Sequence, residues 1–253
     1  MTGMFDLTGR VALVTGGNGG IGLGMARGLA ACGARIAVVG RNAGKNAAAV
    51  AALGGDAFAI AADLTPAEAP AAALAQVLER TGGQLDILVN NAGTNIRRLP
   101  QDVTDAEWAT VMDTNLTSVM RLTRAAYPAL KASGRGRVIC IGSMMSIFGL
   151  PLSPAYGASK GAIVQYVRNL AVAWGPDGIT ANAILPGWID TDLTAGAKRD
   201  MPALNDNVLA RTPQKRWGLP TDFAGIAAFL ASDAATFITG TAIPVDGGMS
   251  VHG

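Results

Sequence analysis

The sequence predicts one α/β domain, residues 1–253, built on a single doubly wound parallel sheet of seven strands with helices on both faces. Short apolar runs typical of buried strands alternate along the chain with longer segments of helical spacing. A glycine-rich turn joins the first predicted strand directly to the first predicted helix. Half of the 253 residues are hydrophobic and 15% are charged, which suits a large core on both sides of a sheet.

Composition argues against several functional classes. The formal net charge is +2 and no basic block occurs, so nucleic acid is not expected as a partner. The only histidine, His252, lies next to the C-terminus, and we therefore expect no histidine-based metal site and no histidine-dependent triad. Cys32 and Cys140 lie in apolar segments and are interpreted as buried thiols of a reducing compartment. No signal peptide and no run of about 18 apolar residues occurs, so we expect a soluble cytoplasmic protein without membrane contact.

The first strand is predicted at residues 10–14, followed by Thr-Gly-Gly-Asn-Gly-Gly-Ile-Gly at 15–22 and a helix at 23–32. Glycines in such a turn allow a sharp bend, close approach to a pyrophosphate, and tight packing of helix on sheet. The phosphates of a dinucleotide would then meet the free N–H groups at the start of the helix. The predicted cofactor contacts in this turn are Thr15, Gly16, Asn18, Gly20, Ile21 and Gly22.

The second strand, residues 35–39, ends at Gly40 and Arg41, where a dinucleotide-binding unit recognises the adenosine ribose. An acidic side chain at this point would bond a 2′-hydroxyl and repel a 2′-phosphate. Arg41 instead offers a guanidinium that matches a phosphate. The sequence therefore favours NADP(H), with NAD(H) possible, and the alternative is that Arg41 is a solvated arginine in a loop.

The middle of the chain continues the alternation of strand and helix. The third strand is predicted at 58–62, and the alanine-rich run from Pro66 to Leu78 is the next crossover helix. The fourth strand, 86–89, is closed by Asn-Asn-Ala-Gly at 90–93, a run that would also suit a simple turn. Residues 104–132 read as a long helical stretch in two pieces, 105–112 and 116–130, with Asn115 between them.

A pair of residues with acid–base potential follows the fifth strand, which is predicted at 137–142. Ser143 stands where that strand ends, and Tyr156 and Lys160 lie four residues apart on the next predicted helix, so they share one face. An ammonium beside a phenol lowers the pKa of the phenol, which makes the tyrosine a plausible acid or base. In isolation a Tyr-x-x-x-Lys spacing also fits an exposed amphipathic helix.

The last third of the chain supplies two further strands. An alternating run at 179–185 reaches Pro186 and Gly187, and residues 242–248 are predicted as the last strand and turn, after a helix at 221–231. Residues 192–217 have the least regular pattern. We interpret the region 188–217 as a mobile lid over the substrate, a device that excludes water when it closes.

Taken together, these motifs resemble the short-chain dehydrogenase/reductase family over nearly the whole chain. The spacing Thr-Gly-x-x-x-Gly-x-Gly, the run 90–93, Tyr-x-x-x-Lys and Pro-Gly-x-x-x-Thr at 186–191 are those of the family. The resemblance implies a Rossmann-type fold, a homotetramer formed through the helices at 104–132 and 155–174, and a catalytic set of Asn115, Ser143, Tyr156 and Lys160. It also implies cofactor contacts by Asp63, Leu64, Asn91, Ala92, Gly93, Tyr156, Lys160, Pro186, Gly187, Ile189 and Thr191.

The resemblance implies hydride exchange between NADP(H) or NAD(H) and a secondary alcohol or ketone. The strings at 91–98, 143–146 and 211–218 are similar to the branch that handles sugar acids, namely gluconate 5-dehydrogenases and 2-dehydro-3-deoxygluconate dehydrogenases. The candidate substrate residues are Arg97 or Arg98, which could pair with a carboxylate, together with Met145 and Trp188. The lid matches that branch poorly. Alternatives are a 3-oxoacyl thioester or cyclic-ketone reductase and, from another class, a non-catalytic NAD(P)-binding sensor.

Overall fold

The computed structural model describes residues 3–252 and shows one seven-stranded, all-parallel sheet in the order β3-β2-β1-β4-β5-β6-β7. This confirms the predicted fold class, and the predicted strands lie within two residues of the observed ones. The strands are β1 (Val11–Thr15), β2 (Arg35–Gly40), β3 (Phe58–Ala61), β4 (Ile87–Asn90), β5 (Arg137–Ile141), β6 (Thr180–Pro186) and β7 (Ala242–Val245).

The central strands are buried on both faces, which explains their continuous apolar sequences. Every residue of β1, β4, β5 and β6 is buried. The strand order reverses between β1 and β4, because the chain moves outward from β1 to β3 and then returns to the other side of β1. In a sheet of this kind, the crevice at the carboxyl ends of these two strands is where a ligand binds.

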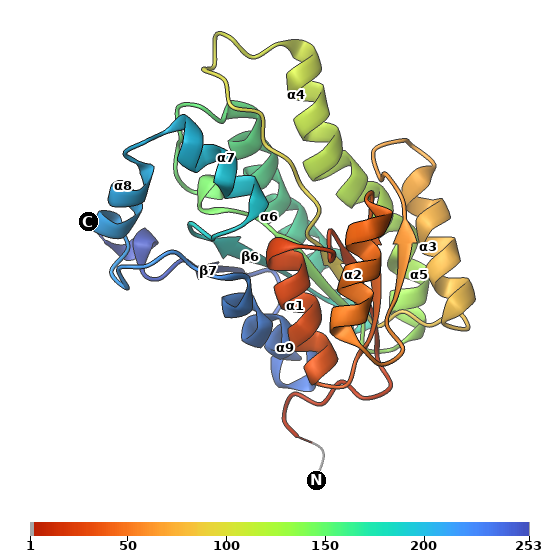
Figure 1. Cartoon of the computed structure of the whole chain (residues 1–253). Coiled ribbons are helices and arrows are strands. Elements are labelled where there is room, and N and C mark those ends of the chain that lie inside the picture. Colours follow the sequence, from red (N-terminus) through yellow and green to blue (C-terminus); the bar gives the residue numbers. More distant parts are fainter. Residues whose placement is uncertain (1–2, 253) are drawn as a thin grey trace.

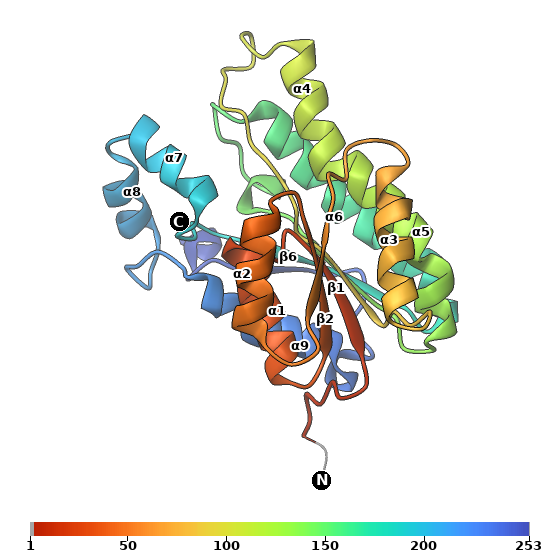
Figure 2. The same cartoon turned by 45° about the vertical axis from the view of Figure 1, so that its right-hand side comes forward.

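Helices cover both faces of the sheet, as Figures 1 and 2 show from two directions. Two buried apolar clusters, one on each face, include alternate residues of the strands, such as Leu13 in one and Ala12 in the other. The helices of one face are α1 (Gly20–Ala31), α2 (Ala43–Leu53) and α9 (Ala224–Ala231). Those of the other face are α3 (Ala69–Arg80), α5 (Ser118–Ala132) and α6 (Pro154–Trp174).

The long helical stretch before β5 is continuous and contains one wide turn. Helix α4 (Asp105–Met112) begins with a capping box between Thr104 and Glu107. It passes through a π-helical turn (Asp113–Thr117) directly into α5. The predicted break between two helical pieces is this turn, and Asn115 lies at its centre. Wide turns of this kind occur often at functional sites.

Several apolar residues on the two helical segments expected to form a subunit interface, 104–132 and 155–174, are buried within their own chain. Val111, Val119, Leu122 and Val167 all belong to the core, whereas Val164 is partly buried. These side chains therefore give no support to an assembly through the helices at 104–132 and 155–174.

The region predicted as the least regular part of the chain is in fact two helices, so that expectation was wrong. They are α7 (Asp192–Asp200) and α8 (Leu204–Arg211), at the side of the molecule in Figure 1. Each is too short, and α7 too poor in apolar residues, to show a clear helical period. Ala197, Leu204 and Val208 form a small buried cluster against Trp188 and Trp217, whose rings meet edge to face. This separate cluster holds the two helices together.

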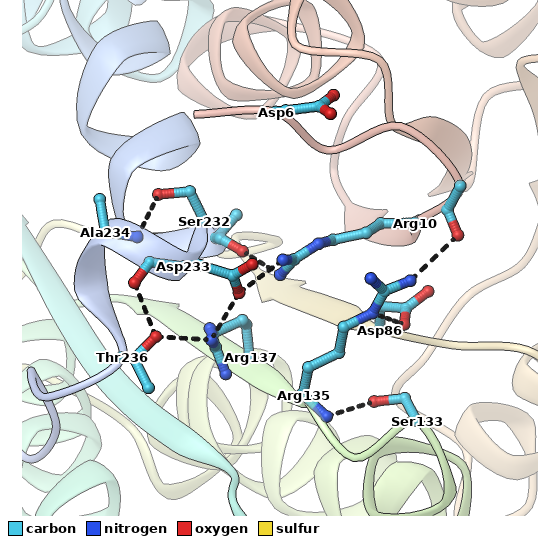
Figure 3. Close-up of polar contacts among 12 residues, drawn as sticks. Asp6, Arg10, Asp86, Ser133, Arg135, Arg137, Ser232, Asp233, Ala234 and Thr236 are labelled. Atoms are coloured by element: carbon cyan, nitrogen blue, oxygen red, sulfur yellow. Dashed lines mark hydrogen bonds and ion pairs between the residues drawn. The ribbon is translucent and has the colours of Figure 1, made fainter. Parts of the chain in front are cut away.

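A group of charged residues lies at the amino ends of the strands, opposite the crevice (Figure 3). Arg10 precedes β1 and Arg137 begins β5, and both side chains are only 2% exposed. They converge on one carboxylate, that of Asp233, at 2.6 Å and 3.5 Å. The Asp233 side chain is 74% exposed, so water shares in its solvation. None of the helices within residues 3–252 is long and apolar enough to span a membrane.

Candidate active site

A cleft of about 520 Å³ opens at the carboxyl ends of the strands, at the crevice between β1 and β4. Segments that follow β1 to β6 line it, and α7 forms part of its wall. The structure brings most of the predicted cofactor and catalytic residues to this cleft: Gly16, Asn18, Gly20, Ile21, Arg41, Asp63, Leu64, Asn91, Ala92, Gly93, Ser143, Tyr156, Lys160, Pro186, Gly187, Ile189 and Thr191.

The turn after β1 has the shape and the free donors that a pyrophosphate needs. Gly16 and Gly20 have φ of +63° and +48°, in the left-handed region that favours glycine. Helix α1 begins at Gly20 without a side-chain cap, and no acidic residue stands in its first turn. Its first N–H groups therefore face the cleft without an internal acceptor or a repelling carboxylate. These features fit a dinucleotide.

Two of the predicted contacts, Thr15 and Gly22, do not line the cleft but shape it from behind. The Thr15 hydroxyl oxygen accepts hydrogen bonds from the N–H groups of Asn91 and Ala92, at 2.9 Å and 3.0 Å. The Asn91 side chain donates back to the Thr15 carbonyl at 3.0 Å. A methyl group at Gly22 would clash with the carbonyl oxygen of Gly16. These contacts lock the turn after β1 to the end of β4.

The end of β2 leaves no room for a side chain at position 40. A Cβ atom on Gly40 would clash with the Asn18 amide, which itself donates to Asn46 at 2.6 Å. Arg41 is exposed and lines the cleft, and so does Lys45 from the first turn of α2. The sequence analysis missed Lys45, although its position four residues after Arg41 was a usable signal. Two cations therefore lie at this end of the cleft.

Ser143, Tyr156 and Lys160 come together at the centre of the cleft, from the end of β5 and the first turns of α6. The Lys160 side chain is 4% exposed, and its Nζ donates to the carbonyl oxygen of Ile141 at 2.7 Å. The same Nζ lies 5.6 Å from the centroid of the Tyr156 ring. The Ser143 hydroxyl accepts from the N–H of Met145 at 3.1 Å and caps the short helix after β5.

The protonation behaviour of the Tyr–Lys pair differs from the sequence expectation. Burial raises the pKa of Tyr156, and a hydrogen bond with Ser143 offsets only part of that rise. Burial lowers the pKa of Lys160 to about 8. The sequence predicted that the ammonium would lower the tyrosine pKa, but Lys160 bonds a backbone carbonyl instead of the phenol. Ser143, rather than Lys160, is the group that favours the phenolate in this geometry.

Asn115 joins the site from the π-helical turn. Its amide oxygen accepts from the N–H of Thr94 at 2.8 Å, and its amide nitrogen donates to the Thr94 carbonyl at 2.9 Å and to Ser159 at 3.0 Å. A Cβ atom on Gly93 would lie 3.3 Å from the Asn115 amide oxygen and 3.6 Å from Lys160 Nζ. Asn115 thus fixes the loop after β4 against α6, next to the lysine.

A second, smaller pocket of about 80 Å³ adjoins the cleft. The two cavities share six lining residues: Ser143, Tyr156, Pro186, Gly187, Leu193 and Thr194. Three of the four predicted substrate residues line this pocket, namely Arg97, Met145 and Trp188. Arg98 does not line it, because its guanidinium pairs with Glu107 at 3.1 Å. Seven other lining residues were not predicted, because they come from separate segments that only the fold brings together: Asn95, Met144, Leu150, Ser153, Leu193, Thr194 and Met249.

Helix α7 forms one wall of both cavities and is tied to the rest of the site. The Arg97 guanidinium donates to the Leu193 carbonyl at 3.3 Å. Lys45 pairs with Asp192 at 2.7 Å, which connects α2 to α7 across the mouth of the larger cleft. Among residues 3–252, no group of three or more His, Cys, Asp or Glu side chains is placed to hold a metal ion.

Comparison with known proteins gives a consistent picture. A protein-family profile described as "Enoyl-(Acyl carrier protein) reductase" matches residues 16–250. The chain is 41% identical to a 2-dehydro-3-deoxy-D-gluconate 5-dehydrogenase of Pseudoalteromonas atlantica, over 96% of this chain and 97% of the relative. It is 37% identical to a 3-oxoacyl-(acyl-carrier-protein) reductase of Escherichia coli, over 96% and 98%.

A solved structure adds a ligand to this comparison. The gluconate 5-dehydrogenase of Burkholderia cenocepacia, crystallised in complex with NADP and tartrate, superposes with a TM-score of 0.92. It is 36% identical, and the match covers 98% of each chain.

Proposed function

Because the chain belongs to the short-chain dehydrogenase/reductase family and is therefore an NAD(P)-dependent oxidoreductase of CH–OH groups, we propose that it acts on a sugar acid or the matching keto acid. The observation that carries this proposal is the position of Arg97 on the wall of the small pocket that Ser143 and Tyr156 share with the cofactor cleft. A guanidinium at that place can pair with a substrate carboxylate while the hydroxyl groups of Ser143 and Tyr156 face the reacting carbon.

The proposed chemistry assigns one role to each catalytic side chain. When bound, a nicotinamide cofactor accepts or supplies the hydride. Tyr156 takes the hydroxyl proton during oxidation and returns one during reduction. Ser143 hydrogen-bonds the reacting oxygen and stabilises the charge that develops on it. Lys160 orients the cofactor ribose and, with Asn115, passes the proton onward to solvent.

Related proteins support the acidic substrate. The Pseudoalteromonas relative acts on a deoxy keto-gluconate, and the Burkholderia enzyme binds tartrate, a hydroxylated dicarboxylate. The chain is nearly as similar to a 3-oxoacyl reductase, so likeness alone does not choose between these substrates. A substrate panel does: gluconate, 2-keto-3-deoxygluconate, neutral polyols, 3-oxoacyl thioesters and cyclic ketones, each followed by NAD(P)H absorbance. Selective turnover of the acids is the expected result, and selective turnover of thioesters or cyclic ketones would contradict the proposal.

The arginine pair offers a matched test of carboxylate recognition. We expect Arg97→Gln to lower kcat/KM on the acidic sugar by roughly 10- to 100-fold relative to a neutral polyol, because a charge-assisted bidentate pair is lost. Arg98→Gln, which removes the same charge one residue further along the chain, should change that ratio less than twofold, since Arg98 pairs with Glu107. Equal effects of the two changes would show that the arginines act only through net charge.

For the cofactor we propose a preference for NADP(H). Arg41 and Lys45 line the adenosine end of the cleft, and Gly40 leaves no space for an acidic side chain at the end of β2. We expect Arg41→Asp to shift the ratio of kcat/KM with NADP(H) to that with NAD(H) at least tenfold toward NAD(H), because the carboxylate repels a 2′-phosphate and can bond a 2′-hydroxyl. An unchanged ratio in steady-state kinetics would remove Arg41 from this role.

We also propose that the protein assembles as a homotetramer, as the family resemblance implies. Large apolar side chains that remain exposed, Phe237 and Val172 among them, suit contacts with other copies. Light scattering of the purified protein tests this, and a monomer mass would contradict it.

A further inference from the structure

One polar pair in the small pocket has hydrogen-bonding capacity that the protein does not use. Asn95, from the loop after β4, donates from its amide nitrogen to the hydroxyl oxygen of Ser153 at 3.0 Å. Ser153 is only 3% exposed, and both residues line the pocket beside Tyr156. The amide oxygen of Asn95 is enclosed and has no hydrogen-bond partner among residues 3–252. Buried acceptors without a partner are rare, because each costs about 1–3 kcal/mol.

The unused capacity of the pair includes an acceptor and a donor side by side. With one amide N–H bonded to Ser153, the Asn95 oxygen can accept and the Ser153 O–H can donate, besides the second amide N–H. Reversing the amide exchanges the two roles: Ser153 would donate to the Asn95 oxygen, and the Asn95 N–H groups would be free. In either orientation, the pair presents one donor and one acceptor, which a partner that both accepts and donates can satisfy together.

We propose that Asn95 and Ser153 recognise a substrate hydroxyl group next to the carbon that reacts. A hydroxyl donates and accepts at once, whereas a methylene does neither and a carboxylate cannot donate. Ser153 is the N-cap of α6 and precedes Tyr156 by three residues, so their backbones lie about one helical turn apart, and both residues line the small pocket. Because the pair and Tyr156 line the same small pocket, we place this hydroxyl close to the reacting carbon. This assignment deepens the proposed function, on which it rests, by requiring a polyhydroxylated substrate.

The surroundings of the pair make this recognition selective. Met144, Met145, Leu150, Leu193 and Met249 supply apolar surface to the same pocket. Hydrogen bonds in such surroundings are stronger than in water, and a substrate that leaves the pair unsatisfied is rejected. The Asn95 oxygen is closed to bulk solvent, so entry of a hydroxyl requires small shifts of the lining. Methionine side chains adapt readily to such shifts.

The test compares two small ketones that differ by one hydroxyl, 2-hydroxycyclohexanone and cyclohexanone, with NADPH as the reductant. The wild-type protein should prefer the hydroxylated ketone at least tenfold in kcat/KM. In Asn95→Ala, and independently in Ser153→Ala, this ratio should fall to about one. If one of the two ketones is not reduced, both are tested as inhibitors of an accepted substrate from the panel, and their inhibition constants are compared. NADPH fluorescence verifies that each variant still binds cofactor.

The control is Asn169→Ala, the same change on an exposed face of α6, which should keep the wild-type ratio. A wild-type protein without preference, or variants that keep the wild-type ratio, would overturn the assignment. Absence of turnover with gluconate and keto-gluconates bears only on the proposed function. If the preference for the hydroxylated ketone persists in that case and Asn95→Ala abolishes it, hydroxyl recognition by Asn95 and Ser153 is supported. The proposal of an acidic sugar substrate is then rejected.

Discussion

At the scale of single residues, the surroundings of Tyr156 keep its phenol protonated. Burial raises the pKa of the phenol, so the side chain is protonated at neutral pH and ready to donate a proton during reduction. The pKa of Lys160 falls to about 8, which leaves the amine charged at pH 7 and partly neutral above pH 8. Both shifts arise from the same cause, the removal of these groups from water at the base of the cleft.

The first residue-scale prediction concerns the phenol itself. Tyr156→Phe removes the proton donor and keeps the ring, so we expect kcat to fall by roughly 10²- to 10⁴-fold. Steady-state rates on an accepted substrate measure this loss, and circular dichroism verifies that the variant is folded. Activity at the wild-type level would contradict the assigned mechanism, whereas NADP(H) binding without any wild-type rate on the panel would favour the non-catalytic sensor.

The second residue-scale prediction concerns the pH dependence of the rate in each direction. Tyr156 carries its proton below its raised pKa and Lys160 is charged below about pH 8, so reduction should proceed at a steady kcat/KM between about pH 6 and 7. Oxidation requires the phenolate, whose fraction rises up to tenfold per pH unit below that pKa, so kcat/KM for oxidation should increase into the alkaline range. Rate profiles in both directions test the sign. An oxidation rate that falls with pH over this range would exclude Tyr156 as the base.

At the scale of elements, close helix packing limits what the chain tolerates near the cleft. Helix α1, whose first residues line the cleft, packs directly against α9. Contact is so close that a Cβ atom on Gly28 would clash with the backbone of Ala224. The position of the glycine-rich turn before α1 therefore depends on Gly28, which does not line the cleft.

This packing gives the element-scale prediction. Gly28→Ala should lower the free energy of unfolding by about 1–3 kcal/mol, because the cost of overpacking exceeds the gain in helix propensity. Gly225→Ala is the matched control at the same pair of helices: Gly225 is exposed, and no atom lies within 4 Å of its added Cβ. It should be neutral or stabilise the fold by up to about 1 kcal/mol. Urea denaturation of both variants measures the difference, and equal effects would refute the packing argument.

At the scale of the whole molecule, the two ends of the sheet carry different groups of residues. The carboxyl ends hold the cleft and the small pocket, whereas the amino ends hold the buried arginines and their carboxylate (Figure 3). The hydrogen bond from Arg10 keeps the pKa of Asp233 below its usual value. The folded protein therefore favours the ionised carboxylate, which contributes stability above the pKa of the unfolded chain and loses it as pH falls through the folded value.

The matching prediction is that Asp233→Asn lowers the free energy of unfolding at pH 7 by about 1 kcal/mol, a modest figure because water screens the exposed carboxylate. The difference from wild type should shrink as the pH falls from 4 toward 2, since wild-type Asp233 then becomes protonated. Urea denaturation across this range measures it. Asp102→Asn, at an exposed loop position, serves as the control and should change stability less than 0.5 kcal/mol. A pH-independent difference would exclude the ion-pair explanation.

The sequence by itself determined the fold class and most of the predicted residues that line the larger cleft, whereas the strand order came from the structure. Apolar runs and glycine spacing are local properties, and parallel strands carry their functional residues to one edge of the sheet without further information. Tertiary structure decided the rest. It placed Arg97 at the small pocket and Arg98 on Glu107, although the two are neighbours in sequence.

Only the fold could pair Asn95 with Ser153, two residues separated by 58 positions. Only the structure showed that residues 192–211 form two short helices, which pack against Trp188 and Trp217. The direction of the Tyr156 pKa shift also depended on tertiary structure, because it follows from burial and from the partner that Lys160 actually bonds. The physical reason is the same in each case. Periodicity reports what a residue does within its own element, whereas orientation, burial and long-range partners arise when the elements pack.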